Sequence, residues 1–206
     1  MADKTFFEIC KRPFQDVPIS DSGVDTPSFL EACEDLLILH FEMLLYADLF
    51  GSAAFSVVQN DMNGNIKKIR DRFLAMPDKS ATLEALVMNE KGEKKRTATE
   101  GLMWLLRGLD FTAQSLKLNQ QNKTEELSVS FTKGYSNTLK KYHSFLIKPV
   151  FTLAMNACPY RAVFYPKLGS NTEKVDKDLN TWLDGLQRIV SRMQSYYTAG
   201  GYDKGL

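Results

Sequence analysis

The sequence has few of the residues that build metal centres, disulfide frameworks and most catalytic sites. Its 206 residues include only two His and three Cys. Cys10, Cys33 and Cys158 lie far apart with no CxxC pair, which argues against a disulfide scaffold and for a reducing compartment. No HExxH, GxSxG, GxGxxG or phosphate-binding loop pattern is present. We therefore predict no metal, no cofactor and no catalytic residue, in a protein that is not an enzyme.

The chain also has no excess of either positive or negative charge and no long apolar run. Lys and Arg total 26 and Asp and Glu total 25, so the basic excess typical of nucleic-acid binders is not present. The most apolar stretch, residues 36–50, is interrupted by His40, Glu42 and Asp48 and is shorter than the roughly 18–20 apolar residues of a membrane span. The first residues contain no apolar signal-peptide region. We expect a soluble, cytoplasmic protein without a nucleic-acid partner.

Strictly alternating β-branched segments are missing as well, whereas apolar residues recur at helical spacing. The pattern predicts an all-α protein of seven or eight helices, with an irregular segment at residues 1–25. No Pro/Gly/Ser-rich linker divides the chain, so we expect a single domain over residues 1–206 with a sizeable core. Pro149 should kink its helix. The expected helices cover residues 27–50, 52–75, 79–90, 97–116, 124–143, 145–157 and 172–199.

Three polar residues form the most informative pattern in the sequence. Asp61, Asn65 and Lys68 stand at i, i+4 and i+7, so they share one narrow stripe of the helix expected at 52–75. This stripe lies at the border between the apolar face and the solvent face. A carboxylate, an amide and an ammonium in a row can bind the hydroxyls or the amide of a ligand. Taken alone, the pattern also fits a solvated helix border with a Lys–Asp ion pair.

Two later residues support the same interpretation. Trp104 lies in an apolar run, and His143 stands beside two lysines. An indole can pack against the C–H face of a sugar ring, and an imidazole can donate to a carbonyl. Ordinary core packing for Trp104 and surface exposure for His143 are the alternatives. An acid–base pair of Asp61 and His143 with Ser144 as nucleophile has no support in the local sequence.

Together, these segments resemble the glycolipid transfer protein family. The resemblance extends over about residues 25–200 and keeps the family's order of motifs. It implies a two-layer sandwich of about eight helices that encloses a hydrophobic lipid chamber. It also implies a monomeric, non-enzymatic carrier that transfers glycosphingolipids between membranes and touches the membrane transiently. The matching segments are Asp61–Lys68 (DMNGNIKK), Leu102–Leu109 (LMWLLRGL), Leu139–His143 (LKKYH) and Pro159–Tyr160.

The resemblance implies a role for each headgroup residue. Asp61 would accept a hydrogen bond from the ceramide amide N–H, and His143 would donate to the amide carbonyl. Asn65 and Lys68 would bind sugar hydroxyls, while the sugar ring stacks on Trp104. A tyrosine near the carboxyl terminus would also contact the headgroup. The implied headgroup site is Asp61, Asn65, Lys68, Trp104, His143 and Tyr202.

The resemblance also implies a chamber lining and a membrane contact. The 13 Phe and 8 Met residues suit an adaptable apolar interior, although ordinary core packing explains them equally well. Phe145, Leu146 and Tyr160 are the implied membrane contact, with a helix-packing face as the alternative. Phe145 stands where vertebrate members have Trp, so its interfacial anchoring should be weaker. The implied lining residues are Phe55, Val58, Phe111, Phe151 and Phe164.

The type of headgroup is the remaining question. The superfamily also contains ceramide-1-phosphate carriers, in which basic residues replace the sugar-facing Asn and Trp and an Arg follows one turn later. Here these positions hold Asn65, Trp104 and Gly108, which lack the forked donors that suit a phosphate. A sugar is therefore favoured. A ceramide-1-phosphate carrier and a glycolipid sensor or scaffold remain as alternatives. Glu100, one turn before Trp104, either bonds a sugar or faces water.

Overall fold

A computed structural model describes residues 4–44 and 49–206 of the chain and confirms the all-α prediction. This part of the chain forms nine α-helices, three short 3-10 helices and one two-stranded hairpin. The elements in chain order are α1 (Phe6–Ile9), η1 (Phe14–Asp16), β1 (Ile19–Ser20), β2 (Gly23–Val24), α2 (Thr26–Leu44), α3 (Leu49–Ala75), η2 (Pro77–Lys79), α4 (Leu83–Glu90), α5 (Thr97–Gln121), α6 (Leu127–Asn137), η3 (Leu139–Lys141), α7 (Ile147–Asn156), α8 (Arg161–Leu168) and α9 (Thr172–Gly200).

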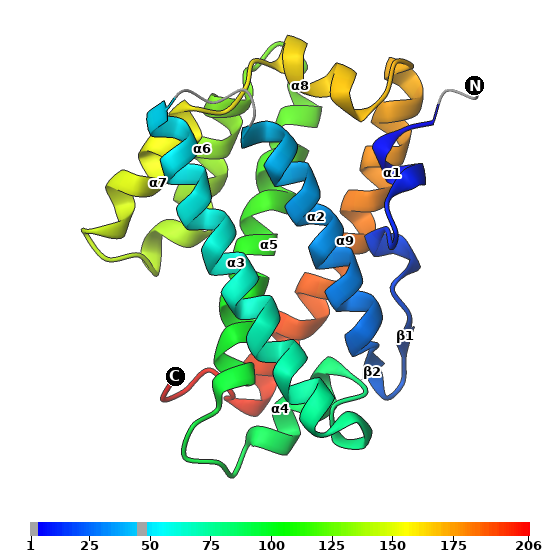
Figure 1. Cartoon of the computed structure of the whole chain (residues 1–206), viewed down its shortest axis with the longest axis vertical. Helices are drawn as coiled ribbons and strands as arrows, with labels where there is room; N and C mark the ends of the chain where they lie inside the picture. Colours follow the sequence, from blue (N-terminus) through cyan, green and yellow to red (C-terminus); the bar gives the residue numbers. More distant parts are fainter. Residues whose placement is uncertain (1–3, 45–48) are drawn as a thin grey trace.

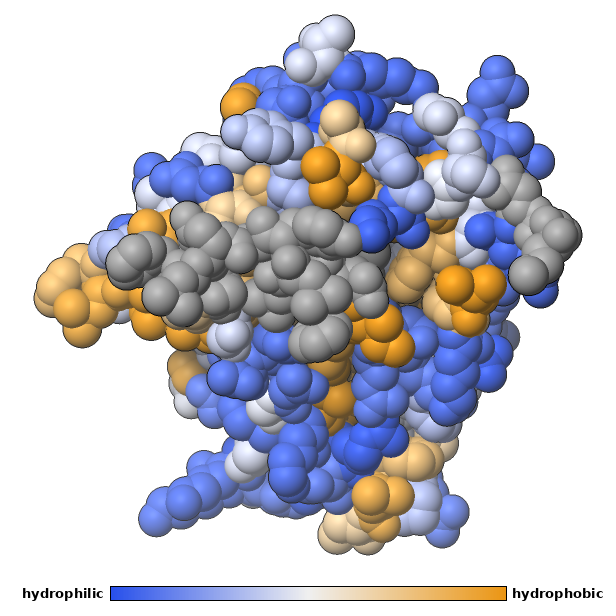
Figure 2. All heavy atoms as spheres, turned by 45° about the horizontal axis from the view of Figure 1, so that its top comes forward, coloured by the Kyte–Doolittle hydropathy of each residue, from blue (hydrophilic) through white to orange (hydrophobic). Residues whose placement is uncertain are grey.

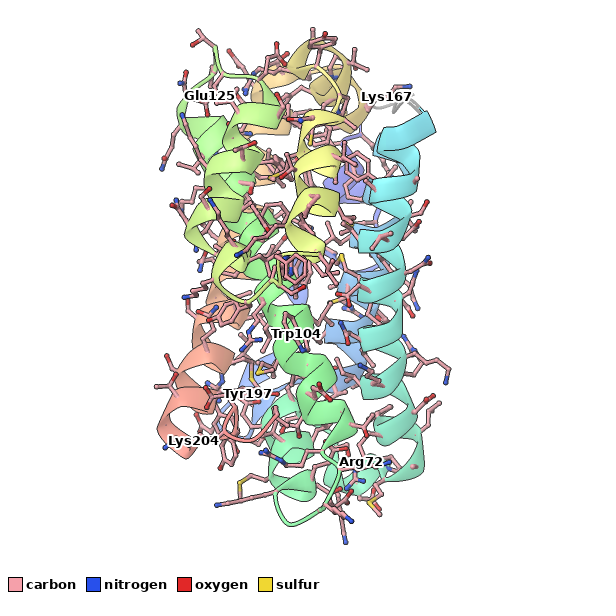
Figure 3. The ribbon with its side chains drawn as sticks, turned by 90° about the vertical axis from the view of Figure 1, so that its left-hand side faces the viewer. Arg72, Trp104, Glu125, Lys167, Tyr197 and Lys204 are labelled. Atoms are coloured by element: carbon pink, nitrogen blue, oxygen red, sulfur yellow. The ribbon has the colours of Figure 1, made fainter. Side chains whose placement is uncertain are left out.

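The long helices lie along the length of the molecule in two layers (Figure 1). Helix α5 is central, because it packs against α3, α6 and α9. Helix α3 in turn packs against α2 and α7. Viewed from the side, α6 and α7 lie in front of α5, and α3 runs beside them (Figure 3). The polar stripe of α3 and the aromatic residues of α5, α6 and α7 therefore meet in one region.

Helices α9 and α5 begin or end at residues whose capping role can be identified in the structure. Asn171 begins α9 by accepting a hydrogen bond from Lys174 N–H at 3.0 Å, and Gly201 ends it in the left-handed region at φ 60°. The N-terminus of α5 is capped by Glu90, which is buried and accepts from the N–H groups of Ala98 (3.1 Å) and Thr99 (2.7 Å). This cap anchors the helix that carries Trp104.

Helix α9 packs its apolar stripe against the amino-terminal segment. The Trp182 ring contacts Phe7 and Phe14, with centroid separations of 5.8 and 5.0 Å. The backbone of Gln15 passes so close to Gly185 that an added Cβ would lie 2.4 Å from its nitrogen. The segment before residue 26, expected to be irregular, thus contains short packed elements. The residues that the spacing predicted for the apolar stripe of α9 are all buried: Val175, Leu179, Trp182, Leu186, Ile189 and Met193.

Several boundaries differ from the sequence expectations. Pro149 lies in the first turn of α7, where its missing N–H needs no helical partner, so it starts this helix instead of kinking it. Helix α6 ends at Asn137, which places His143 in the connection between η3 and α7. Gly51 and Ser52, expected between two helices, lie within α3. Helix α8 follows the expected break at Pro159 and was not predicted.

Candidate functional site

The predicted polar stripe of α3 forms a short chain of hydrogen bonds. Asn65 Nδ2 donates to Asp61 Oδ2 at 3.3 Å, and Lys68 Nζ donates to Asn65 Oδ1 at 3.2 Å. The two charged neighbours orient the amide, because its donor end faces the carboxylate and its acceptor end faces the ammonium. Asn65 is only 2% exposed, whereas Asp61 is exposed and Lys68 is half-buried. The stripe is therefore an ordered row of polar groups at the edge of the core.

The Asp61 carboxylate has a perturbed proton affinity. The protein around it removes solvent and raises its pKa above the ordinary value of 3.8, while Lys68 and the Asn65 amide act in the opposite direction. The native state consequently holds this proton to a higher pH than the unfolded chain does. The ionised carboxylate destabilises the native state above its raised pKa, and this cost disappears as the pH falls below 3.8.

We expect Asp61→Asn to stabilise the lipid-free protein at pH 7, by only about 0.5 kcal/mol because Asp61 is exposed as a residue and solvent screens the effect. Thermal unfolding measured from pH 7 down to pH 3 follows the effect, and the gain should shrink as the pH falls toward 3.8, because the raised pKa lets the native protein take up this proton first. Asp71→Asn is the matched control on the same helix, since Asp71 is exposed and pairs with Lys67 at 2.6 Å. A loss of stability in Asp61→Asn at pH 7 contradicts the prediction.

An aromatic cluster holds Trp104 beside the polar row. The indole lies nearly parallel to the His143 ring (centroids 6.3 Å apart, 22°) and edge-on to Tyr142 (6.5 Å, 79°). The Arg107 guanidinium lies 4.6 Å from the Trp104 ring centroid and 3.8 Å from that of Tyr142. Figure 3 shows Trp104 near the middle of the molecule, on α5. Since Trp104 is only partly buried, one region of the indole remains available to a ligand.

Gly101 brings α5 close to the polar row of α3. A Cβ at this position would lie 3.0 Å from Lys68 Cδ and 3.4 Å from the backbone oxygen of Asn65. A larger residue would push the helix that carries Trp104 away from the polar row. Sequence reasoning missed this residue, although a glycine inside an apolar helical pattern is the signal that points to a close approach.

His143 is half-buried and neutral at physiological pH. Burial lowers its pKa below the ordinary value of 6.5, and the positive charges of Lys148 and Arg107 lower it further. Its Nδ1 atom lies 3.2 Å from the Tyr135 hydroxyl. A neutral imidazole has one N–H donor and one acceptor nitrogen, so His143 can make one hydrogen bond of each kind.

Three of the predicted headgroup residues line one small cavity. The cavity has a volume of about 30 Å³, and Asp61, Trp104 and His143 lie on its wall. Asn65 and Lys68 are joined to it through the hydrogen-bond chain that ends at Asp61. Gly108 also lies on the wall, and a Cβ there would meet nothing within 4 Å. The fold thus brings an acceptor, an aromatic ring and an imidazole from three separate segments to one place.

A second cavity, of about 20 Å³, is entirely apolar in its lining. Val58, Phe111 and Phe151 line both cavities, so the polar site lies against the apolar interior. Phe164 is buried in α8 and is not on the wall of this cavity as the structure describes it. Half of the lining residues were not predicted from the sequence, because the type of an apolar residue does not indicate which cavity it faces. The lining residues are Phe55, Val58, Phe111, Phe131, Phe151, Ala154, Met155 and Cys158.

The structure does not bring Tyr202 to this cavity. The Tyr202 ring is buried against Tyr196, with centroids 5.0 Å apart, and its hydroxyl lies 2.8 Å from Met88 Sδ. The turn that carries it is held by Arg96, whose Nη1 donates to the Tyr202 carbonyl at 2.8 Å. Among the described residues it belongs to a separate cluster of α4, α9 and the carboxyl-terminal turn.

The three predicted membrane-contact residues are all exposed. Their exposed fractions are 79% for Phe145, 68% for Leu146 and 74% for Tyr160. Phe145 and Leu146 precede α7 and Tyr160 follows it, so they flank the two ends of this helix. Figure 2 shows hydrophobic side chains projecting at the edge of the molecule where α7 lies in Figure 1. Sequence reasoning missed Leu153 on α7 and Val163 on α8, which are also exposed.

Reactive and metal-binding groups are sparse in the described part of the chain. Burial raises the pKa of the Cys10 thiol to about 11 and that of Cys158 to about 12, so both stay protonated at neutral pH. Residues 4–44 and 49–206 hold no cluster of three His, Cys, Asp or Glu side chains suited to a metal ion. Over the same residues, none of the helices combines the length and apolarity needed to span a bilayer.

Comparison with known proteins identifies the family to which this fold and cavity belong. A family model described as glycolipid transfer protein (GLTP) matches residues 24–170. A glycolipid transfer protein of Aureobasidium melanogenum is 53% identical over 192 residues, which cover 93% of this chain and 92% of that protein. The chain belongs to the glycolipid transfer protein family. Human pleckstrin homology domain-containing family A member 8 is 26% identical, and the match covers 97% of this chain but 40% of that longer protein.

Solved structures agree with this assignment. HET-C2, a fungal glycolipid transfer protein, superposes with a TM-score of 0.86 at 45% identity and covers 94% of this chain and 97% of its own. FAPP2, described as selecting simple glycosphingolipids with this fold, gives 0.85 at 25% identity, covering 97% and 98% of the two chains. Mouse ceramide-1-phosphate transfer protein gives 0.80 at 19% identity, covering 96% and 98%, and at that identity it shows the fold alone.

Proposed function

We propose that this protein binds glycosphingolipids by their sugar and ceramide amide, buries their hydrocarbon chains and transfers them between membranes without altering them chemically. The observation that carries the proposal is the pair of adjoining cavities, one with Asp61, Trp104 and His143 on its wall and one with an apolar wall. The family and its named relatives support the same function.

The polar groups match the chemistry of a ceramide headgroup. The amide has one donor and one acceptor, and Asp61 and His143 supply one acceptor and one donor. Leaving such a group unpaired in a partly buried place would cost about 1–3 kcal/mol. The hydroxyls at the edge of a sugar ring need directional partners, which Asn65 and Lys68 provide, while its C–H face packs on the Trp104 indole. We also propose that Tyr202 acts only indirectly, because it lies in the separate cluster described above.

The apolar interior lowers the barrier to lipid exchange. Moving a chain of about 16 carbons from a bilayer into water costs roughly 13 kcal/mol, at about 0.8 kcal/mol per CH2. An apolar chamber removes most of this cost. Cavities of about 30 and 20 Å³ have room for no more than a water molecule or two each. Lipid entry in this proposal therefore requires that Val58, Phe111 and Phe151, which line both cavities, move apart.

A sugar fits this site better than a phosphate. The cavity wall presents the Trp104 ring, a neutral His143 and the open space beside Gly108. Asp61 is the charged residue on the wall itself, Lys68 stands at the end of the polar row, and the nearby Arg107 guanidinium packs on the Trp104 and Tyr142 rings and is not part of the wall. A phosphate dianion placed here would meet a carboxylate and no guanidinium fork on the cavity wall.

Transfer between vesicles tests the proposal. Donor vesicles carry fluorescent glucosylceramide or, in parallel, fluorescent ceramide-1-phosphate, and acceptor vesicles are in excess. We expect glucosylceramide to move in proportion to protein concentration and at least about 10-fold faster than ceramide-1-phosphate. Mass spectrometry of the recovered lipid should show an unaltered molecule. A modified lipid would indicate an enzyme, binding without transfer would indicate a sensor, and protein without bound lipid would overturn the proposal.

We propose that the exposed apolar residues around α7 form the membrane-docking face, defined as Phe145, Leu146, Leu153, Tyr160 and Val163. The chain around them supports this assignment, because residues 127–172 contain no Asp or Glu. Apolar side chains enter the interface while nearby cations attract an anionic leaflet. The basic residues of the same segment are Lys133, Lys140, Lys141, Lys148, Arg161 and Lys167.

Combined replacement of Phe145 and Leu146 by Ala is expected to lower vesicle adsorption and transfer about 10-fold, since it truncates two of the three most exposed side chains of this face. Leu74→Ala is the matched control, because Leu74 on α3 is 67% exposed and Leu146 is 68% exposed. Sedimentation with vesicles and transfer rates are measured for both proteins. Unchanged adsorption of the double variant would place the docking face elsewhere.

The remaining features of the proposal concern the working form of the protein. We propose that residues 1–206 act as one domain, as a monomer and in the cytoplasm. The three free cysteines are compatible with a reducing compartment. Light scattering of the purified protein tests the monomer, and microscopy of a tagged chain tests the location.

A further inference from the structure

Tyr135 is the hydrogen-bond partner of His143 and lies on the wall of neither cavity. Tyr135 lies on α6, is 4% exposed, and its hydroxyl is 3.2 Å from His143 Nδ1. The Tyr135 ring stacks on Phe151, with centroids 5.3 Å apart and planes 13° apart, and meets Phe111 edge-on. The position of the hydroxyl is therefore set by the packed aromatic wall of the interior.

This contact limits the form of the imidazole. A neutral imidazole can accept at Nδ1 and carry its proton on Nε2, or carry the proton on Nδ1 and accept at Nε2. The Tyr135 hydroxyl makes no other hydrogen bond among the described residues. If Nδ1 carried the proton, this buried hydroxyl would keep its own proton without an acceptor. Pairing of both groups is complete only when Tyr135 donates to Nδ1 and Nε2 carries the proton.

We infer that Tyr135 is a positioning residue for lipid recognition, which holds His143 in the Nε2–H form so that this N–H can donate to the amide carbonyl of a bound ceramide. The inference rests on the proposed function. In the other form, the Nε2 lone pair would face the carbonyl oxygen, and two acceptors would meet. The same hydrogen bond also fixes the ring relative to Phe151, which lies 4.4 Å from the His143 centroid.

Protonation of both groups agrees with this geometry. Burial raises the pKa of the Tyr135 phenol, so it remains a donor at neutral pH. The charged groups that face His143 are Lys148 and Arg107, which keep the imidazole neutral, and Asp61, which lines the same cavity.

Tyr135→Phe tests the inference, because it keeps the ring and removes only the hydroxyl. The matched control is Tyr197→Phe, since Tyr197 is 5% exposed and its hydroxyl donates to the Thr99 carbonyl at 2.7 Å, away from the lipid site. Nitrogen NMR of the imidazoles reports the tautomer directly. The chain has only two His residues, so a His40→Gln variant assigns the His143 signals.

In the lipid-free wild type and the Tyr197 variant, we expect His143 to show an acceptor-type Nδ1 and a protonated Nε2. In Tyr135→Phe the two tautomers should mix, and glucosylceramide transfer should fall about 3- to 10-fold. An unchanged tautomer in Tyr135→Phe overturns the inference, as does a mixed tautomer with wild-type transfer. If the wild type fails to transfer glucosylceramide, the proposed function fails, while the NMR result still decides whether Tyr135 sets the tautomer.

Discussion

Glycosylceramide transfer is expected to fall at least about 100-fold when Asp61 is replaced by Val and Trp104 by Ala in the same chain. The double variant removes the acceptor for the ceramide amide N–H and the ring on which the sugar packs. A charge-assisted hydrogen bond contributes about 1.5–3 kcal/mol, and an aromatic contact adds about 0.5–1.5 kcal/mol. The two groups line one cavity, so their effects are not expected to add exactly as independent terms.

Vesicle transfer and thermal unfolding are measured together for this double variant. Asp71→Val serves as the control, because Asp71 is an exposed carboxylate on α3 whose partner is Lys67 rather than the polar row. The control should transfer lipid at the wild-type rate. The double variant should remain folded, since Asp61 is exposed and Trp104 is only partly buried. A folded double variant that transfers at the wild-type rate would show that the headgroup binds elsewhere.

Headgroup selectivity is expected to shift from sugar to phosphate when Trp104 and Gly108 are both replaced by Arg. The change removes the stacking ring and adds two guanidinium forks one helical turn apart on the cavity wall. Space is available, because a Cβ at Gly108 would meet nothing within 4 Å. We expect glucosylceramide transfer to fall about 100-fold and ceramide-1-phosphate transfer to rise at least about 10-fold.

A matched control separates this local effect from the added charge. Gly64→Arg places a guanidinium on the exposed face of α3, at another glycine whose Cβ would have open space. It should retain the wild-type preference for glucosylceramide. Both lipids are assayed with the same vesicles, and adsorption is recorded to exclude a change in membrane binding. If the double Arg variant adsorbs normally but transfers neither lipid faster than before, the assignment of Gly108 to the headgroup wall is wrong.

The two assays address different steps of the proposed transfer. The headgroup variants change recognition at the cavity and leave Phe145 and Leu146 untouched. The docking-face variant changes adsorption and leaves Asp61 and Trp104 untouched. A loss of transfer with normal adsorption therefore points to the cavity, and a parallel loss of both points to the surface around α7.

The spacing of apolar residues was sufficient to predict those parts of the fold that depend only on residues close in the sequence. The 3.6-residue spacing predicted α9 with its buried stripe, since a single apolar face has one way to pack against the core. The boundary at Asn137 could not be predicted in this way. Apolar and aromatic residues recur along 124–143 with no Pro or Gly at the boundary, and the end of α6 depends on how η3 and α7 pack afterwards.

The headgroup site likewise contains residues that local spacing could bring together and residues that it could not. Asp61, Asn65 and Lys68 share one helix, so their spacing alone places them side by side, and the structure joins them by hydrogen bonds. Trp104 and His143 come from separate segments, and only the family resemblance connected them with the row. Tyr202 was connected with the row by the same resemblance, and the structure places it in a separate cluster, where Arg96 holds its turn and its ring packs on Tyr196.

The sequence by itself determined an all-helical chain and a polar row on α3, and the family resemblance added a headgroup position without basic forks. The first two properties follow from spacing along the chain and from residue type, which need no knowledge of the rest of the chain. Only the tertiary structure decided that Gly101 lets α5 approach that row and that Tyr135 meets His143 Nδ1. It also decided which aromatic residues line the apolar cavity. Contacts between distant segments depend on how helices pack, and the type of an apolar residue does not indicate which residue it will contact.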